Sequence, residues 1–172
     1  MTISVLACID KRFDALLAEF YGNNGYNANY YMVTAAGSSL PISYSRIAKE
    51  PSLDCFTVEN CKLNKKLKGA MTTNLSISES LSSIEQLDIV DHQDCGAFRV
   101  FLPRADLNSK ENEKIIHAKS LNIASNKLNF TGPIRKLLID LNGTVGQLED
   151  DNTYTVIYKG PGNNPNGLFF NS

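Results

Sequence analysis

Apolar and polar positions along the chain fall into two repeating patterns. Short runs rich in β-branched or aromatic side chains predict buried strands at 3–7, 29–34, 88–91 and 153–158. Apolar side chains three or four positions apart predict helices at 13–20, 76–87, 96–102 and 133–141, and a longer one from Asn108 or Ser109. Strands that alternate with helices favour an α/β fold, in which helices flank a mainly parallel central sheet of about four to five strands.

Local signals add detail to three of these helices. Ser76 and Glu79 have the form of a capping box, which predicts that a helix begins there. Pro133 stands where the first turn of another helix is expected, and 142–143 would stop that helix. His117 lies in the long helix, where a surface position explains it more simply than a role as a proton shuttle.

Residues 40–75 follow neither pattern. Two prolines, scattered polar residues and a group of lysines predict a long insertion with at most one short helix. The lysines are Lys62, Lys65, Lys66 and Lys68. A connection of this length is uncommon without a function, so we expect a lid or a subunit contact. Cys55 and Cys61 lie inside it, and their spacing favours free thiols over a second metal site.

Length and charge fit one domain that spans residues 1–172. A chain of 172 residues can bury roughly 70% of its unfolded surface, which gives a core without disulfides. The 17 basic and 18 acidic residues leave a net charge of -1, which favours neither a nucleic-acid partner nor an anionic membrane. No apolar run approaches the roughly 20 residues that span a bilayer. No signal-peptide pattern is present, so we expect a cytoplasmic protein whose four cysteines stay reduced.

The first candidate site follows the strand at 88–91. His92 and Cys95 lie three positions apart, so an imidazole and a thiolate that leave the tip of one strand can converge on one ion. A soft sulfur ligand beside a borderline nitrogen selects Zn²⁺ over Mg²⁺ or Ca²⁺. A small cysteine is also a common packing residue, so the pair alone leaves both interpretations open.

A second segment strengthens the metal interpretation. Cys8, Asp10 and Arg12 follow the strand at 3–7 at alternate positions, and alternate side chains of an extended segment share a face. We therefore expect all three in one pocket at the carboxyl end of that strand. Asp10 can form a bidentate pair with Arg12, or it can turn to a cation. The two segments together offer three zinc ligands and an optional fourth: Cys8, His92, Cys95 and, in fourth place, Asp10.

A Cys-x-Asp-x-Arg segment after the first strand and a His-x-x-Cys-Gly segment after a later one resemble the β-class carbonic anhydrase family. The likeness covers residues 3–38 and 76–98. It implies one Zn²⁺ per chain and a lyase that hydrates CO2 reversibly to bicarbonate by zinc-bound hydroxide. It also implies a homodimer or a higher homo-oligomer. The apolar segment 168–170 is expected to pack on the body of the protein or on another subunit.

The resemblance also implies roles for individual residues. Three protein ligands leave a fourth tetrahedral position for water, whose pKa Zn²⁺ can lower to about 7 from about 15.7. Asp10, kept ionised and off the metal by Arg12, is expected to accept a hydrogen bond from that water. The backbone N–H of Gly96 is expected to steady the product. The loop at Ala36 and Gly37 either borders the substrate pocket or is a plain turn.

The same ligands also permit a closed site. Asp10 can leave Arg12 and take the fourth position, either as an acid-inhibited state or as part of a purely structural zinc site. Arg12 favours the open, catalytic arrangement because a structural site gives it no evident purpose. One departure from the family pattern bears on this choice. Asp91 replaces the glycine that usually precedes the histidine, where it either orients His92 or opposes hydroxide formation by its charge.

Three functions therefore fit the ligands. The first is a carbonic anhydrase, the second is a hydrolase of carbonyl sulfide or carbon disulfide at the same zinc, and the third is a non-catalytic zinc-binding role. A redox role for Cys95, as a low-pKa thiol where a helix begins, is a weaker alternative. It lacks a Cys-x-x-Cys partner, and it leaves Asp10 and Arg12 unexplained.

Overall fold

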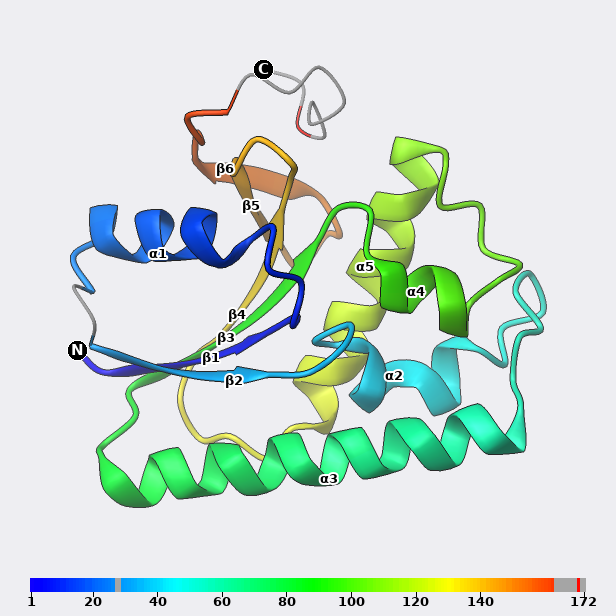
Figure 1. The fold of residues 1–172 in the computed structure, drawn as a ribbon, viewed down its shortest axis with the longest axis horizontal. Helices are drawn as coiled ribbons and strands as arrows, with labels where there is room; N and C mark the ends of the chain where they lie inside the picture. Colours follow the sequence, from blue (N-terminus) through cyan, green and yellow to red (C-terminus); the bar gives the residue numbers. More distant parts are fainter. Residues whose placement is uncertain (27–28, 163–169, 171–172) are drawn as a thin grey trace.

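The computed structural model describes residues 1–26, 29–162 and 170, and it shows helices on both faces of a sheet (Figure 1). In this part of the chain the sheet has six strands, in the order β2-β1-β3-β4-β5-β6. The strands are β1 Ile3–Ala7, β2 Tyr30–Thr34, β3 Gln86–His92, β4 Ile134–Ile139, β5 Val145–Leu148 and β6 Tyr154–Tyr158. The helices are α1 Asp14–Asn23, α2 Leu40–Ile47, α3 Val58–Leu81, α4 Gly96–Phe101 and α5 Lys110–Lys127. The predicted α/β class is confirmed.

The order of the strands places a switch point in the middle of the sheet. β2, β1, β3 and β4 are parallel, and β5 and β6 continue the sheet as antiparallel strands. From β1 the chain moves outward to β2 and then crosses back to β3 on the other side of β1. Ligand sites of open α/β sheets lie at the carboxyl ends of the strands at such a switch. The ends of β1 and β3 are therefore the expected place for a site.

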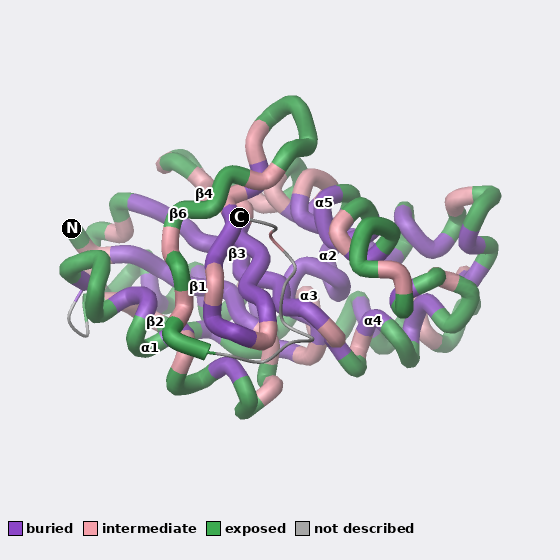
Figure 2. The backbone as a smooth tube through the Cα atoms, turned by 90° about the horizontal axis from the view of Figure 1, so that it is seen from above, coloured by how far each residue is buried: buried purple, intermediate pink, exposed green. Residues whose placement is uncertain are grey.

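The core has an apolar layer on each face of the sheet and a third apolar cluster among α2, α4 and α5. β1 and β3 are buried along their whole length, which Figure 2 shows as purple tubes. On one face, Val5 packs with Phe20 and the rest of the apolar side of α1. On the other, Leu6 packs with Met71 of α3 and Leu121 of α5. Alternate residues of one strand thus serve opposite layers, as the two-residue period of a strand requires.

The prediction for residues 40–75 was wrong. The segment forms α2 and most of α3, a helix of 24 residues, instead of an irregular insertion. Thr57 caps α3 by accepting a hydrogen bond from the Asn60 backbone N–H at 3.1 Å, and a threonine at this position is a local signal for the start of a helix. The apparent capping box at Ser76 and Glu79 lies inside this helix. The hydroxyl of Ser76 donates to the carbonyl of Thr72, one turn earlier, at 3.0 Å.

The helix predicted at 133–141 is also wrong, because this segment is strand β4. Its consecutive buried residues Leu137, Leu138 and Ile139 fit a central strand as well as a helical stripe, and pairing with β3 decides between them. Gly143, with a φ of +80°, belongs to the turn between β4 and β5 and does not end a helix. The sheet consequently has six strands instead of four to five, since neither β4 nor β5 was expected.

Two further features concern the surface. In the described part of the chain, no helix combines the length and apolar character that crossing a membrane requires. Of the apolar segment 168–170, residues 168 and 169 lie outside the described residues. The ring of Phe170 lies 5.7 Å from the ring of Tyr154 in β6, measured between centroids.

Candidate metal centre

The two predicted ligand segments meet at the switch point of the sheet. Cys8 follows β1 directly, His92 ends β3, and β1 pairs with β3 in parallel, with Ala7 opposite Val90. The sulfur atoms of Cys8 and Cys95 lie 3.9 Å apart, and the donor atoms of Cys8, His92 and Cys95 all lie within 4.8 Å of one another. Two thiolates on a tetrahedral Zn²⁺ would lie about 3.8 Å apart. The three residues are therefore close enough to bind a metal ion.

The imidazole of His92 presents the nitrogen that a metal needs. Its Nδ1 lies 2.8 Å from the backbone carbonyl oxygen of Gln93, so Nδ1–H donates there and Nε2 keeps its lone pair. Nε2 is buried and has no hydrogen-bond partner among the described residues. The ring of Phe13 covers the imidazole, with centroids 4.2 Å apart. A buried acceptor without a donor costs about 1–3 kcal/mol, and a bound cation would remove that cost.

The protonation of the two thiols also fits a cation. The hydrogen bond with Cys95 is the main cause that lowers the pKa of Cys8 to about 4, helped by the Gly37 N–H, while burial opposes it. The same hydrogen bond, together with burial, raises the pKa of Cys95. Two thiolates this close repel each other in a buried site, so one proton is kept between them. A divalent cation would hold both sulfurs as thiolates.

The loop after β2 supports Cys8 from the other side. The backbone N–H of Gly37 donates to the sulfur of Cys8 at 3.3 Å. Gly37 has a φ of +80°, and a Cβ atom there would lie 3.1 Å from the Cβ of Ala97. Only glycine meets both conditions without strain. The hydroxyl of Ser38 donates to the carbonyl of Leu6 at 2.9 Å, which ties the loop to β1.

Asp10 and Arg12 form the bidentate pair that the sequence predicted. Arg12 donates to the two oxygens of Asp10 from Nε at 3.0 Å and from Nη2 at 2.7 Å. Its Nη1 donates to Asp94 at 3.1 Å, and Asp94 also accepts from Arg99. The hydrogen bond from Arg12 is the main cause that lowers the pKa of Asp10 to about 2. Asp10 is thus held beside the three donor atoms and outside their cluster, with Oδ2 3.9 Å from Nε2 of His92.

A cavity of about 500 Å³ opens beside these residues. Cys8 and Asp10 line it, and so do two residues that were predicted to border the substrate, Ala36 and Gly96. The rest of its wall is mainly apolar and includes Ala97, Val100 and Phe101. Gly37 contributes its N–H to Cys8 and does not line the cavity.

Asp91 and His117 form a buried pair that the sequence did not reveal. Asp91 is 1% exposed, and its Oδ2 accepts hydrogen bonds from the hydroxyl of Ser39 at 2.6 Å and from Nδ1 of His117 at 3.0 Å. The expected surface position of His117 was wrong, because this side chain is fully buried. Glu113, one turn earlier on α5, lies 3.8 Å from its Nε2 and accepts the backbone N–H of Asp94 at 2.6 Å. The pattern of Glu113 four positions before His117 was the available local signal.

The hydrogen-bond partners of Asp91 show which way its carboxylate points. Both of its oxygens accept hydrogen bonds from Ser39, and one also accepts from His117, on the side of β3 that faces α5. Burial lowers the pKa of His117, but the hydrogen bond to Asp91 and the negative charges of Asp91 and Glu113 outweigh it and raise this pKa to about 9. Asp91 therefore faces a protonated imidazole, and its role is to join β3 to α5 and to the loop that supports Cys8.

Two uncharacterized proteins are similar to this chain in sequence. No protein-family model matches the chain. An uncharacterized protein of Rickettsia conorii is 26% identical over 150 residues, which cover 84% of this chain and 70% of that protein. An uncharacterized protein of Rickettsia bellii is 31% identical over 75 residues, which cover 44% of this chain and 46% of that protein.

One solved structure has a fold similar to that of this chain. The structure of the β-carbonic anhydrase CcaA matches with a TM-score of 0.51 and 13% sequence identity, over 91% of this chain and 78% of that one. At this identity the match concerns the fold. The sheet and the helices that flank it agree with the β-carbonic-anhydrase-like fold that the sequence predicted. The chain therefore has the fold of a β-carbonic anhydrase and, at its switch point, a three-residue cluster suited to a metal ion.

Proposed function

We propose that the protein is a zinc-dependent carbonic anhydrase that converts CO2 and water reversibly to bicarbonate. The observation that carries this proposal is the arrangement of Asp10, which Arg12 holds against the metal-binding cluster without making it a ligand. When bound, Zn²⁺ supplies a Lewis acid that lowers the pKa of water to near neutrality. Cys8, His92 and Cys95 would hold it. The reducing cytoplasm, where we place the protein, keeps both cysteines available as ligands.

Asp10 has the properties of a positioning acceptor. With its pKa lowered to about 2, its carboxylate stays ionised throughout the neutral range. Two guanidinium N–H groups fix its plane, and a carboxylate has further lone pairs that can accept a hydrogen bond from a water molecule at the cluster. A water that donates a hydrogen bond to Asp10 has its remaining lone pair directed away from Asp10, toward the cavity. Asp10 and Arg12 thus orient the attacking oxygen.

The cavity suits an uncharged linear substrate. Its wall is mainly apolar, with Ala97, Val100 and Phe101, and therefore binds water weakly. CO2 can displace that water and lie next to Cys8 and Asp10. Gly96 and Ala36 bring backbone close to the same space, where the N–H of Gly96 would steady an oxygen of the product. Carbonyl sulfide and carbon disulfide have the same shape and could use the same ligands. A hydrolase of either molecule is therefore the alternative outcome of the assay.

The surroundings of the cavity also support self-association. Ile9 and Val100 line it, and their side chains are 63% and 69% exposed. Two exposed apolar residues at the rim of a site favour contact with another protein surface. A homodimer, or a higher homo-oligomer that covers this rim, is the arrangement that we propose. Sedimentation of the purified protein and of a Val100→Lys variant tests it, and an unchanged monomer for both would contradict it.

Metal content and activity test the function. We expect one Zn²⁺ per wild-type chain, loss of zinc in Cys8→Ser, and full zinc in Cys61→Ser, which removes a thiol of similar exposure outside the cluster. Stopped-flow hydration of CO2 should be chelator-sensitive, and Asp10→Asn should lower the rate while it retains zinc. Release of hydrogen sulfide from carbonyl sulfide, without hydration of CO2, would assign the alternative substrate. Full zinc with neither activity would leave the site structural and refute the enzymatic proposal.

A further inference from the structure

A separate cavity of about 390 Å³ lies between α2, α3 and the end of α5. It shares no lining residue with the cavity beside the metal cluster. Its apolar part comes from α2, with Pro41, Ile42 and Tyr44. Its polar part comes mainly from the lysine-rich stretch of α3 and from Lys127 at the end of α5. The group of lysines that the sequence displays therefore has a hollow beside it.

The cations around this hollow repel one another. Lys65, Lys68 and Lys127 line it, and Arg46 of α2 lies close enough to act on Lys127. Burial, followed by the charges of Lys68 and Arg46, lowers the pKa of Lys127. In the described part of the chain, none of these four cations forms an ion pair with a carboxylate, whereas Lys119 is paired with Glu50 and Lys136 with Asp150. A bound anion would relieve this uncompensated positive charge.

The ammonium of Lys127 is already oriented. It donates to the carbonyl of Ile42 at 3.2 Å and to the hydroxyl of Ser45 at 3.4 Å, both on α2. A lysine ammonium has three donors, so one remains for a ligand. Lys127 thereby bridges from α5 to α2 at the edge of the cavity, and less side-chain freedom is lost when an anion binds.

A buried amide supplies the complementary group. Asn64 lines the cavity and is 1% exposed, and its Nδ2 donates to the Asn60 carbonyl at 2.8 Å. This bond fixes which way the amide faces, because the opposite orientation would set two oxygens against each other. Its Oδ1 has no hydrogen-bond partner among the described residues. A ligand with a hydrogen-bond donor would satisfy this oxygen, in addition to bringing the negative charge that the lysines need.

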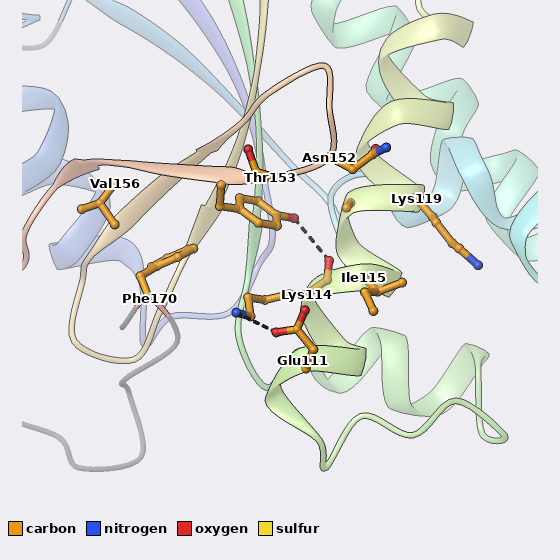
Figure 3. A pocket seen from close by; sticks show the side chains of 10 residues that line it. Glu111, Lys114, Ile115, Lys119, Asn152, Thr153, Val156 and Phe170 are labelled. Atoms are coloured by element: carbon orange, nitrogen blue, oxygen red, sulfur yellow. Dashed lines mark hydrogen bonds and ion pairs between the residues drawn. The ribbon is translucent and has the colours of Figure 1, made fainter. Parts of the chain in front are cut away.

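A larger cavity shows by contrast what an unsuitable site looks like. It has about 580 Å³ and lies between α5 and β6 (Figure 3). Its charged side chains are paired within the protein, because Lys114 contacts Glu111 at 3.0 Å and Lys119 contacts Glu50 at 2.6 Å. The hydroxyl of Tyr154 donates to the carbonyl of Lys114. The cavity at α3 is the smaller of the two, and it is the better candidate for an anion site because its positive charges are not paired within the described part of the protein.

We propose that the cavity between α2, α3 and α5 binds a small phosphate monoester. The phosphate, with nearly two negative charges, lies between Lys68 and Lys127, where ammonium groups act as point-charge partners. The organic part of the ester lies on Ile42 and Pro41, and an ester that carries a hydroxyl group on this part donates it to Asn64. A hollow of this size, formed by side chains from three helices, fits a small molecule better than the extended backbone of a nucleic acid. The proposal is independent of the metal centre and of its activity.

Cys61 provides a local probe of this binding. It lines the cavity and is partly exposed, whereas Cys55 is buried in the neighbouring core. The full chain as purified is treated with iodoacetamide in the presence of phenyl phosphate. The rate of Cys61 alkylation is read by peptide mapping, which separates Cys61 from Cys8. We expect phenyl phosphate to slow the reaction of Cys61. Phenol, which has the ring without the phosphate, should not slow it.

Three variants locate the phosphate. Lys68→Gln and Lys127→Gln should each raise the dissociation constant of phenyl phosphate about tenfold, the loss expected for one hydrogen bond to a charged group. Lys66→Gln is the matched control, because it removes an exposed charge from the same helix without lining the cavity, and it should bind as wild type does. No protection of Cys61, equal protection by phenol, or equal weakening by Lys66→Gln would overturn the proposal. Tighter binding of a short RNA with the same lysine dependence would also overturn it.

Discussion

Replacement of His117 by glutamine removes the one buried cation that faces Asp91 and Glu113 in the described structure. Nδ1 of His117 donates to Asp91 at 3.0 Å, and the side chain is fully buried against the ring of Phe98. Glutamine can keep one hydrogen bond to Asp91, but it carries no charge. The variant therefore leaves Asp91 as a buried carboxylate with neutral partners, which is the costly way to break a buried ion pair.

The magnitude follows from the pKa of the imidazole. Its value rises from 6.5 to about 9 in the folded protein, through Asp91 and Glu113 and against the opposing effect of burial. At about 1.4 kcal/mol for each pKa unit, protonated His117 stabilises the fold by about 3 kcal/mol. Because the folded-state pKa lies above the unfolded one, this stabilisation is complete below pH 6.5 and disappears as the pH rises through 9.

Urea unfolding of zinc-loaded wild type and His117→Gln across this pH range measures the effect. We expect the wild type to exceed the variant in free energy of unfolding most strongly below pH 6.5, and the difference to shrink by about 3 kcal/mol above pH 9. The pH dependence of the zinc ligands is common to both proteins and cancels in the difference. A cycle with Asp91→Asn isolates the pair. A difference that does not change with pH would refute the protonated imidazole.

Other changes act on single contacts. Gly37→Ala should destabilise the protein by about 1–2 kcal/mol and weaken zinc binding, measured by chelator competition, because φ is +80° and Ala97 is close. Arg12→Lys should keep zinc but lower CO2 hydration roughly ten- to hundredfold in a stopped-flow assay, since a lysine cannot hold both oxygens of Asp10. Asp88→Asn should cost about 3–5 kcal/mol in urea unfolding without loss of zinc, because buried Asp88 pairs with Arg135 through two hydrogen bonds.

The metal cluster could be predicted because its signal is chemical and local. Cys8 and His92 each follow an apolar run that was correctly assigned as a strand, and thiol and imidazole together indicate a soft metal wherever they meet. The proximity of Cys8 and His92 in space is the one part of this prediction that depends on long-range structure, because it requires β1 to lie next to β3. The switch point of a parallel sheet supplied that expectation from topology alone.

The errors arose where tertiary pairing decides between two local patterns. The run at 137–139 satisfies a helical stripe and a buried strand equally, and β3 provides the partner that makes it β4. β5 has four residues and includes Gly146, so its signal is too short to be read before its neighbours are known. In α3, Lys-rich and polar residues hide an apolar face formed by Met71 and Leu75.

Asp91 shows why a departure from a family pattern has to be interpreted with its partners. Side chains alternate along β3, so His92 points to the metal cluster while Asp91 points to α5 and to the loop after β2. Ser39, two residues after Gly37, donates to Asp91, and Gly37 donates to Cys8. One carboxylate thus holds in place the loop that supports a ligand. Because a glycine at 91 would leave Ser39 and His117 without this acceptor, these three residues constrain one another even though they are far apart in sequence.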